Sequence, residues 1–232
     1  MSYFHDVLLD AAKLIREQGQ VHETNNWQAR ESHMKMREIF NFNFTVTMPS
    51  GIEDAQIITN PNLPWAEDHF QERVSGIPMN PAPSYEWWPF YKQDEKWRPD
   101  GVFSHTYPER MWTPALHGVR YDYGNLGDVV KMLQQDPTTR QAFLPIWFPE
   151  DTGAVHGERV PCTIGYQFYI RDGQLNMFYP MRSCDFRRHF RNDVYMAMRL
   201  GQWVAEQTGT RPGTLSMNVW NLHIFEGEEW FL

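Results

Sequence analysis

Disulfide bonds, long apolar runs and an apolar N-terminus are all missing from this sequence of 232 residues. The two cysteines, Cys162 and Cys184, provide no disulfide framework, so a reducing compartment fits. A membrane-spanning helix needs about 18 consecutive apolar residues, and no such run occurs. Asp6 and Asp10 fall where a secretory signal requires apolar side chains. The sequence therefore predicts a cytoplasmic protein that neither is exported nor spans a membrane.

Basic residues are fewer than acidic ones, and known cofactor-binding motifs are missing. Lysine and arginine number 21 against 29 acidic residues, a formal net charge of −8. A broad attraction to nucleic acid or an anionic membrane is therefore not expected, and any anion must be bound locally. The nine histidines form neither a His-Glu-x-x-His motif nor a set with paired cysteines, which disfavours a metal site. Glycine-rich dinucleotide and phosphate-loop motifs are missing as well.

What is present suffices for one hydrophobic core, because 41% of the residues are hydrophobic. We expect a single domain over residues 1–232. Apolar residues at three- and four-residue spacings predict a helix over Tyr3–Gln18, and a period of two predicts a half-buried strand over Phe40–Val46. Further helices are predicted at 65–74, 126–135 and 192–207, and further strands at 142–148, 163–170, 175–179, 215–220 and 222–225. The aromatic stretch Ile77–Thr113 has no clean period, which favours an irregular lid or binding loop.

One predicted hairpin brings a candidate nucleophile next to an arginine. The Asp-Gly pair at 172–173 is typical of a two-residue turn. The register that this turn sets places Cys162 opposite Ser183 and next to Arg182, although the pleat points Arg182 to the other face unless a bulge intervenes. A neighbouring cation lowers the pKa of a thiol, so Cys162 is a candidate nucleophile, with a buried structural thiol as the alternative. Cys184 faces away in this register and is expected to be structural.

Four arginines and a serine gather between positions 182 and 191 of this net acidic chain. Guanidinium groups and a hydroxyl satisfy several phosphate oxygens at once, which predicts phosphate binding. For Arg187 and Arg188 a solvated turn is the alternative. Glu67 and Glu72 lie on the predicted helix 65–74, where they are ordinary surface carboxylates unless a cleft surrounds one of them.

Several motifs occur in the order and spacing of a known family. They are Pro161-Cys162, Tyr166-Gln167-Phe168-Tyr169, Asp172-Gly173, Arg182-Ser183-Cys184-Asp185 and Leu222-His223-Ile224-Phe225. With them the segment Val160–Glu228 resembles the thymidylate synthase family, in particular its dCMP hydroxymethylase branch from DNA-modifying phages. The resemblance continues more weakly upstream through residues 136–140, Tyr107 and Glu67. It implies an α+β fold with a large mixed twisted β-sheet flanked by helices, and a homodimer formed through the sheet face. If the chain is phage-encoded, the expected location is the cytoplasm of the host.

The resemblance also implies a folate-dependent reaction. Cys162 would add to C6 of a pyrimidine nucleotide, and C5 would then take the methylene group of 5,10-methylenetetrahydrofolate. Arg182 and Ser183 would hold the 5′-phosphate, with Arg140 reaching it from the partner subunit. Glu67, or Glu72 as the alternative carboxylate, would organise water and proton transfers, and Tyr107 would serve proton removal at C5. Asp185 would line the nucleotide and folate pocket, and His223 would contact the sugar. Gln167 is a further substrate-binding residue that the resemblance implies.

Asp193 decides which base the resemblance implies. Family members that act on uracil carry an asparagine at this position. An aspartic acid accepts a hydrogen bond from a 4-amino group and, when protonated, donates one to N3, which is the complement of cytosine. A mismatched base leaves buried polar groups unpaired, at a cost of about 1 to 3 kcal/mol each. The sequence therefore predicts conversion of dCMP to 5-hydroxymethyl-dCMP.

The sequence leaves other functions open besides hydroxymethylation of dCMP. Methylation to 5-methyl-dCMP, a dUMP-directed synthase or hydroxymethylase, and an inactive nucleotide-binding relative are the other readings. Gln141 stands where the family commonly has a second arginine, and Phe225 replaces a tyrosine that shares the sugar contact. The segment Glu228–Leu232 is either a shortened closing tail or a packed end.

Overall fold

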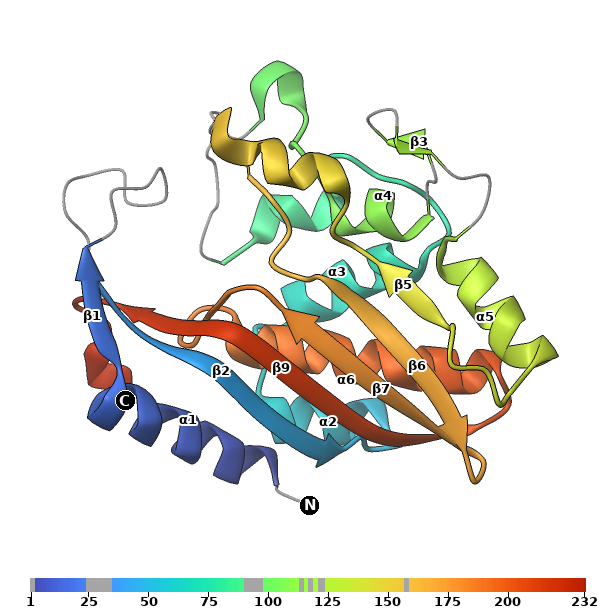
Figure 1. Cartoon of the computed structure of the whole chain (residues 1–232), viewed down its shortest axis with the longest axis horizontal. Helices are drawn as coiled ribbons and strands as arrows, with labels where there is room; N and C mark the ends of the chain where they lie inside the picture. The colour runs from blue at the N-terminus through green and yellow to red at the C-terminus, as the bar shows by residue number, and fades with distance from the viewer. Residues whose placement is uncertain are drawn as a thin grey trace.

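A mixed β-sheet forms one layer of the protein (Figure 1). The computed structural model describes residues 3–23, 35–89, 98–112, 115–116, 119–120, 124–156 and 159–232. In the described chain the strands run in the order β1 (Gln20–Glu23), β2 (Lys35–Thr47), β9 (Arg211–Phe225), β7 (Gln174–Met181), β6 (Gly165–Arg171) and β5 (Phe143–Pro145), with β8 (Cys184–Asp185) paired to β9. The β7–β9 and β8–β9 pairs are parallel and the others antiparallel. The predicted large mixed sheet is confirmed.

Helices cover one face of this sheet, and the strands pass in front of them in Figure 1. The central helix is α6 (Phe190–Gln207), which packs on β7 and β9 and is contacted in turn by α2 (Ile52–Thr59) and α3 (Trp65–Val74). The amphipathic α1 (Phe4–Gln18) packs on β2, as its apolar spacing predicts. Because α6 contributes thirteen buried residues, the core lies between this helix and the sheet. The α+β class is confirmed.

The opposite face of the sheet carries large exposed side chains. Phe143, Phe178 and Trp220 are each more than 40% exposed on it. The half-buried strand predicted over Phe40–Val46 is confirmed as part of β2, but Phe40 and Phe42 differ in burial. Asn41, between them, has a φ of 58°, and this left-handed residue interrupts the alternation, so Phe42 is buried while Phe40 is exposed.

The hairpin between β6 and β7 follows the predicted turn. Asp172 and Gly173 have φ values of 52° and 70°, and positive φ at both central residues is typical of a type I′ turn. Gln167 lies opposite Phe178, which is the predicted register. The sequence therefore predicted this part of the sheet residue by residue.

The register changes by one residue beyond β6. An isolated bridge pairs Thr163 with Met181, and the amide of Arg182 donates to the carbonyl of Cys162 at 2.7 Å. Cys162 therefore lies opposite Arg182, and the prediction that it lies opposite Ser183 was wrong. This irregularity is the bulge that the pleat argument left open, and it changes which side chains meet at Cys162.

The segment predicted to be irregular contains short helices. They are η1 (Pro83–Trp87), η3 (Pro99–Gly101) and α4 (Tyr107–Trp112), while residues 90–97 and 113–114 lie outside the described residues. The two predicted terminal strands are one continuous strand, β9. The other elements are α5 (Leu126–Gln135), the β3 (Ala115–Leu116) and β4 (Val119–Arg120) pair, η4 (Pro149–His156) and η5 (Glu229–Phe231). No helix in the described ranges is long and apolar enough to cross a membrane.

Candidate active site

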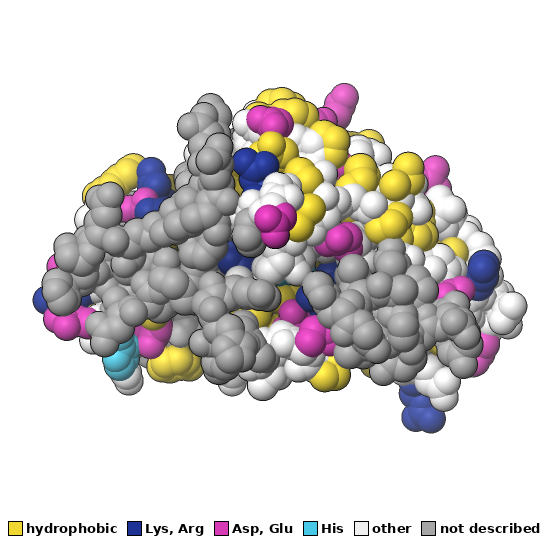
Figure 2. Space-filling model, turned by 90° about the horizontal axis from the view of Figure 1, so that it is seen from above, with side chains coloured by type: hydrophobic (Ala, Val, Ile, Leu, Met, Phe, Trp, Pro, Cys, Tyr) yellow, Lys and Arg dark blue, Asp and Glu magenta, His cyan; other side chains and the backbone are white. Residues whose placement is uncertain are grey.

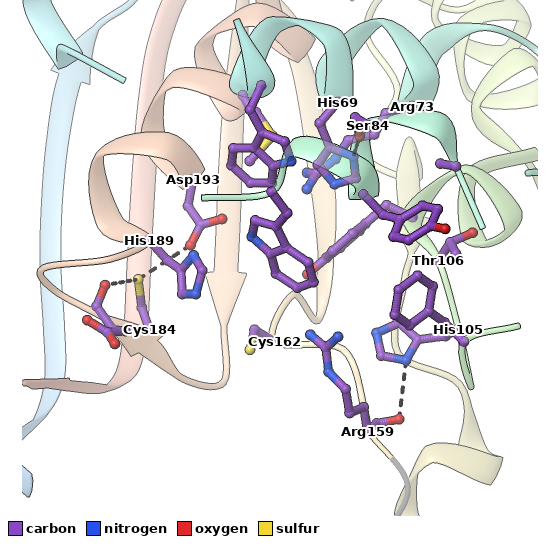
Figure 3. A pocket seen from close by; sticks show the side chains of 18 of the residues that line it. His69, Arg73, Ser84, His105, Thr106, Arg159, Cys162, Cys184, His189 and Asp193 are labelled. Carbon is purple, nitrogen blue, oxygen red and sulfur yellow. Dashed lines mark hydrogen bonds between the residues drawn. The ribbon is translucent and has the colours of Figure 1, made fainter. Parts of the chain in front are cut away.

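A pocket lies on the helix side of the sheet, where α3, the η1 segment, α4 and the start of α6 surround the loop that carries Cys162. The predicted site residues that line it are Tyr107, Cys162, Ser183, Asp185 and Asp193. Figure 3 shows Asp193 and Cys184 on one side, Cys162 and Arg159 below, and His69 and Arg73 above. The structure thus brings together residues that are up to 86 positions apart, from Tyr107 to Asp193.

The thiol of Cys162 faces this pocket and is partly exposed there. Burial raises the pKa of Cys162 above its usual range, although the Arg182 and Arg159 guanidinium groups act to lower it. The effect of the neighbouring arginine is therefore present as predicted but is outweighed by burial. Cys162 is accordingly a protonated thiol at neutral pH, and it needs a proton acceptor to become a nucleophile.

Asp193 shares a hydrogen bond with the second cysteine. The Cys184 thiol donates to Asp193 Oδ2 at 3.4 Å (Figure 3). Burial raises the pKa of Asp193 to about 6, against the opposing effects of Arg73 and Cys184. Cys184 also lines the pocket, so the prediction that it faces away from this neighbourhood was wrong. The one-residue register change beyond β6 explains the difference, because it moves every later side chain of that strand.

Asp185 presents a carboxylate oxygen without a hydrogen bond. Its Oδ1 accepts from the amides of Arg187 and Arg188 at 3.0 and 2.9 Å, whereas Oδ2 is buried with no hydrogen-bond partner in the described chain. The guanidinium Nε of Arg188 lies 3.6 Å from Oδ2, an ion-pair distance. Burial raises the pKa of Asp185 to about 6. Oδ2 is therefore available as an acceptor for a ligand.

The tail residue Glu228 holds the same arginines. Its carboxylate accepts from Arg187 at 2.9 Å and from Arg188 at 3.0 and 3.1 Å. The solvated-turn reading of Arg187 and Arg188 was therefore wrong, because both side chains are partly buried ion-pair partners. Glu228 thus packs the end of the described chain against the segment that carries Asp185.

Tyr107 begins α4 and faces the pocket. Its hydroxyl oxygen accepts from Thr163 Oγ1 at 3.1 Å, and the Arg73 guanidinium lies 4.0 Å from its ring centroid. Arg73 is 5% exposed, and its Nε has no hydrogen-bond partner among the described residues. Burial raises the pKa of Tyr107 well above its usual value. A buried cation stacked on a phenol therefore forms one wall of the pocket.

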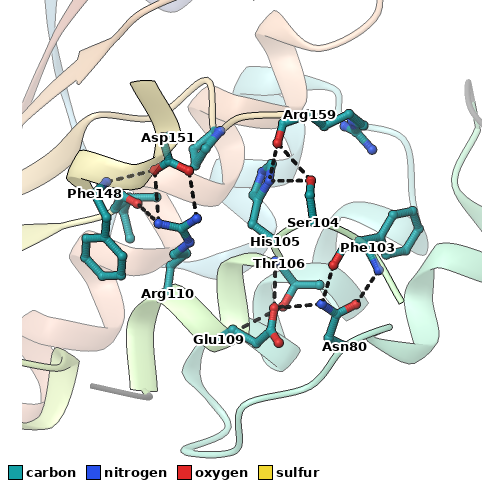
Figure 4. Close-up of polar contacts among 12 residues, drawn as sticks. Asn80, Phe103, Ser104, His105, Thr106, Glu109, Arg110, Phe148, Asp151 and Arg159 are labelled. Atoms are coloured by element: carbon teal, nitrogen blue, oxygen red, sulfur yellow. Dashed lines mark hydrogen bonds and ion pairs between the residues drawn. The ribbon is translucent and has the colours of Figure 1, made fainter. Parts of the chain in front are cut away.

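A hydrogen-bond network fixes the segment that leads into α4 (Figure 4). Asn80 donates to the carbonyl of Phe103 and accepts from its amide, both at 2.8 Å. Glu109 Oε2 accepts from Asn80 at 2.9 Å and from the Thr106 amide at 3.0 Å. Because these contacts join the residue segments before η1 and after η3 to α4, they set the position of Tyr107 in the wall.

Helix α3 directs its two glutamates to different places. Glu67 does not line the pocket, because its carboxylate accepts from Arg199 at 3.0 Å and from the Tyr195 hydroxyl at 2.5 Å, both on α6. Burial acts to raise the pKa of Glu67, but the hydrogen bonds from these partners hold it below its usual value. Glu72 accepts instead from His69 and Ser84, which do line the pocket.

Other predicted site residues do not line the pocket. Arg182 donates through Nε to the carbonyl of Pro161 at 3.4 Å. His223 is buried, with Nδ1 at 3.0 Å from Asn221 Oδ1. Gln167 lies on the open face of the sheet and donates to the Ala142 carbonyl at 3.1 Å. Arg140 is exposed before β5.

Sequence reasoning missed several residues that line the pocket. They are Trp65, His69, Arg73, Ser84, His105 and His189. The pairing of His69 with Glu72 at three-residue spacing beside Trp65, on a predicted helix, is the signal that could have identified part of this set. Figure 2 shows acidic and basic side chains interspersed over the described part of one face.

Comparison with known proteins places the chain in one family. The thymidylate synthase family model matches residues 81–228, and the chain belongs to this family. A protein of Methanosarcina barkeri named "Putative thymidylate synthase" is 32% identical over 126 residues, which are 53% of this chain and 54% of that protein. The thymidylate synthase of Bacillus phage phi3T is 24% identical over 140 residues, 60% of this chain and 47% of that protein. The match spans about half the length of these curated relatives.

Proposed function

We propose that this protein transfers a one-carbon unit to C5 of dCMP and produces 5-hydroxymethyl-dCMP, using 5,10-methylenetetrahydrofolate and water. The observation that carries the proposal is the shared pocket of Cys162 and Asp193, a thiol and an acid that the family resemblance assigns to the two ends of a pyrimidine ring. Membership of the thymidylate synthase family supports the reaction class. The choice of base and of product rests on this chain's own residues.

Asp193 reads the base in this proposal. One of its oxygens accepts from Cys184, and Oδ1 has no hydrogen-bond partner within the described residues. That oxygen accepts from the 4-amino group of cytosine, while a protonated Asp193 donates to N3. With a pKa raised to about 6, the carboxyl holds a proton far more readily than an ordinary aspartate does. A uracil ring offers O4 and N3–H instead and leaves an unpaired contact.

Cys162 is the nucleophile of the proposed reaction. The thiol proton passes to solvent as the sulfur bonds to C6, and the C5=C6 electron pair makes C5 a carbon nucleophile. The cofactor supplies, when bound, the one-carbon unit that becomes the new substituent of C5. Tyr107, which lines the same pocket, serves the removal of the C5 proton. Water then adds to the exocyclic methylene carbon of the nucleotide and gives the hydroxymethyl product.

The phosphate and the sugar of the nucleotide are assigned to residues at and beside the edge of the pocket, namely Arg182, Ser183 and His223. Arg182 and Ser183 hold the 5′-phosphate, since a guanidinium and a hydroxyl are both donors. Ser183 lines the pocket, and the charge of Arg182 acts to lower the pKa of Cys162, so both lie near the nucleophile. His223 contacts the sugar, and Phe225 packs edge-on at 5.4 Å from its ring. Gln167 faces away from the pocket in this protomer, so the proposal assigns it no contact there.

The pocket fits the folate by chemistry. Trp65 stacks on Trp88 with ring planes 4° apart, which forms a flat apolar wall suited to an aromatic pterin. Oδ2 of Asp185, which has no hydrogen-bond partner in the described chain, is an acceptor for a ring N–H or amino group. We therefore assign Trp88 and Asp185 to the cofactor side of the pocket.

A homodimer is part of the proposal. Phe143, Phe178 and Trp220 on the open sheet face provide an apolar surface that a second copy can cover. Arg140 precedes β5 at one edge of this sheet and is exposed, so it is free to reach the partner's phosphate site. The monomer is expected to be inactive for this reason.

Mass spectrometry of the nucleotide product tests the proposal. Purified protein is incubated with methylenetetrahydrofolate and either dCMP or dUMP. The expected result is dCMP with an added CH2O. Addition of CH2 alone identifies a methyltransferase, turnover of dUMP but not dCMP identifies a uracil-directed enzyme, and nucleotide binding without turnover identifies an inactive relative; each of these overturns the proposal.

A further inference from the structure

Helix α3 carries a hydrogen-bonded pair on its pocket side. Glu72 Oε2 accepts from His69 Nδ1 at 3.1 Å and from Ser84 Oγ at 2.5 Å, and Oε1 accepts from the Ser84 amide at 2.5 Å. The side chains of His69 and Glu72 are 17% and 11% exposed. The carboxylate is therefore fixed by three donors, and the imidazole is fixed by the carboxylate.

These contacts determine the tautomer of His69. Ser84 has one hydroxyl proton, and its 2.5 Å contact with Glu72 uses that proton. Ser84 Oγ, 3.2 Å from Nδ1, can then only accept from the imidazole. Hydrogen bonds from His69 and Ser84 hold the pKa of Glu72 below its usual value against the effect of burial, so Glu72 is an ionised acceptor. Nδ1 consequently carries the proton, and Nε2 has a free lone pair.

The ring of His69 is also held in orientation by aromatic neighbours. It stacks on Trp65 with centroids 5.3 Å apart and meets Tyr107 edge-on at 6.2 Å. Nε2 has no hydrogen-bond partner within the described residues. Burial, with the Arg73 charge, lowers the pKa of His69 to about 4 despite Glu72, so the ring is neutral near pH 7. A neutral, oriented imidazole with a free nitrogen lines the pocket.

Glu67 cannot share this position on the helix. Successive residues of an α-helix are about 100° apart, so residue 67 lies nearly opposite residue 69, while residues 69 and 73 share a face. The structure agrees, since His69 and Arg73 line the pocket and Glu67 binds Arg199 on α6. Glu67 therefore places no carboxylate at the pocket wall for the role that the family resemblance implies.

We propose that His69 transfers the proton in the water-addition step and that Glu72 positions it; this rests on the proposed function. As a water oxygen bonds to the exocyclic methylene carbon, one water proton moves to Nε2. The electron pair of the methylene double bond becomes the C5=C6 bond, and the C6–S bond breaks to leave the Cys162 thiolate. The imidazolium, paired with the Glu72 carboxylate, then returns the proton to the sulfur.

The variants His69→Asn, Glu72→Gln and Glu67→Gln separate the roles. Asparagine keeps a donor near the Nδ1 position but lacks Nε2. We expect His69→Asn to lower kcat by about 100-fold or more and Glu72→Gln by about 10- to 100-fold. The KM for dCMP and its affinity by calorimetry should stay within about threefold, because neither side chain is assigned to nucleotide binding. Glu67→Gln, the competing assignment, should lower kcat far less than Glu72→Gln.

Nitrogen NMR of the wild-type protein tests the same proposal without catalysis. The expected spectrum shows His69 neutral with its proton on Nδ1, and this signature should change in Glu72→Gln. A proton on Nε2, a kcat of His69→Asn within threefold of wild type, or a larger kcat loss in Glu67→Gln than in Glu72→Gln each overturns the proposal. Wild-type protein that converts no pyrimidine nucleotide, with the Nδ1 tautomer observed, instead overturns the proposed function.

Discussion

The thiol of Cys184 donates to Oδ2 of Asp193 at 3.4 Å, from the short strand β8 to the first turn of α6. Burial raises the pKa of this thiol well above its usual value, so it is a permanent donor at neutral pH. The contact holds one carboxylate oxygen, and the other has no hydrogen-bond partner within the described residues. The second cysteine of the sequence is therefore a structural support for the residue proposed to select the base.

Replacing Cys184 by alanine should weaken the recognition of cytosine. A lost hydrogen bond of about 1 kcal/mol corresponds to roughly fivefold in an equilibrium constant. We expect kcat/KM for dCMP to fall by about fivefold to tenfold, with most of the change in KM. Steady-state kinetics of Cys184→Ala and Cys184→Ser measure this. Serine restores an O–H donor, so equal losses in the two variants would contradict the role.

Replacing Asp193 by asparagine should shift the substrate preference toward dUMP. The asparagine amide donates to O4 and its carbonyl accepts from N3–H, which is the complement of uracil. A change of one matched polar pair at a buried edge is worth about 2 to 3 kcal/mol, or roughly 30- to 150-fold in the ratio of kcat/KM values. Competition between labelled dCMP and dUMP measures the ratio. An unchanged preference would remove Asp193 from base selection.

The same substitution should change stability in a pH-dependent way. Burial raises the pKa of Asp193 from an ordinary 3.8 to about 6, so the folded protein binds the proton more tightly than the unfolded chain. The stability that this proton contributes is complete below pH 3.8 and is lost as the pH rises through 6. Asp193→Asn should therefore be more stable than wild type at pH 8, by at most about 3 kcal/mol, and gain little at pH 4. Thermal unfolding at both pH values tests this, and a gain that is larger at pH 4 contradicts it.

Cys162→Ala should abolish turnover while dCMP binding is retained. The sulfur forms the bond to C6 in the proposed reaction, and no other thiol replaces it, because Cys184 is committed to Asp193. The most direct measurement is exchange of the C5 hydrogen of dCMP with heavy water in the absence of folate, since that exchange needs only addition and elimination at C6. Exchange at the wild-type rate in Cys162→Ala would show that the thiol is not the nucleophile.

The sequence predicted those parts of the fold that repeat a local pattern. Helix α1 and the β6–β7 hairpin follow from apolar periodicity and from the Asp172-Gly173 turn, both of which act over a few residues. The side chains around Cys162 depended instead on one irregularity between Thr163 and Met181. A single inserted residue reverses the face of the sheet to which the later side chains of a strand point, and the apolar periodicity of the sequence does not reveal it.

The two glutamates of α3 show a second limit of sequence reasoning. Glu67 and Glu72 are both polar positions of one short helix, so the apolar pattern does not distinguish them. The choice depends on Arg199 and Tyr195, which lie 128 and more positions away and bind Glu67. Tertiary contacts of that kind decide which face of a helix meets a pocket, and they leave no local signal.

A buried ion pair supports the helix that carries Tyr107. Arg110 and Asp151 are 3% and 7% exposed and form a two-pronged pair at 2.8 and 3.0 Å, and Asp151 also accepts from the Phe148 amide (Figure 4). Arg110→Met leaves an uncompensated buried carboxylate and should lower the free energy of unfolding by about 3 to 5 kcal/mol. The double variant Arg110→Met/Asp151→Asn keeps an acceptor for Phe148 and removes the charge, so it should be more stable than Arg110→Met alone. Urea denaturation of the three proteins measures both differences. A double variant no more stable than Arg110→Met would show that lost packing around Arg110, rather than an unpaired charge, causes the damage.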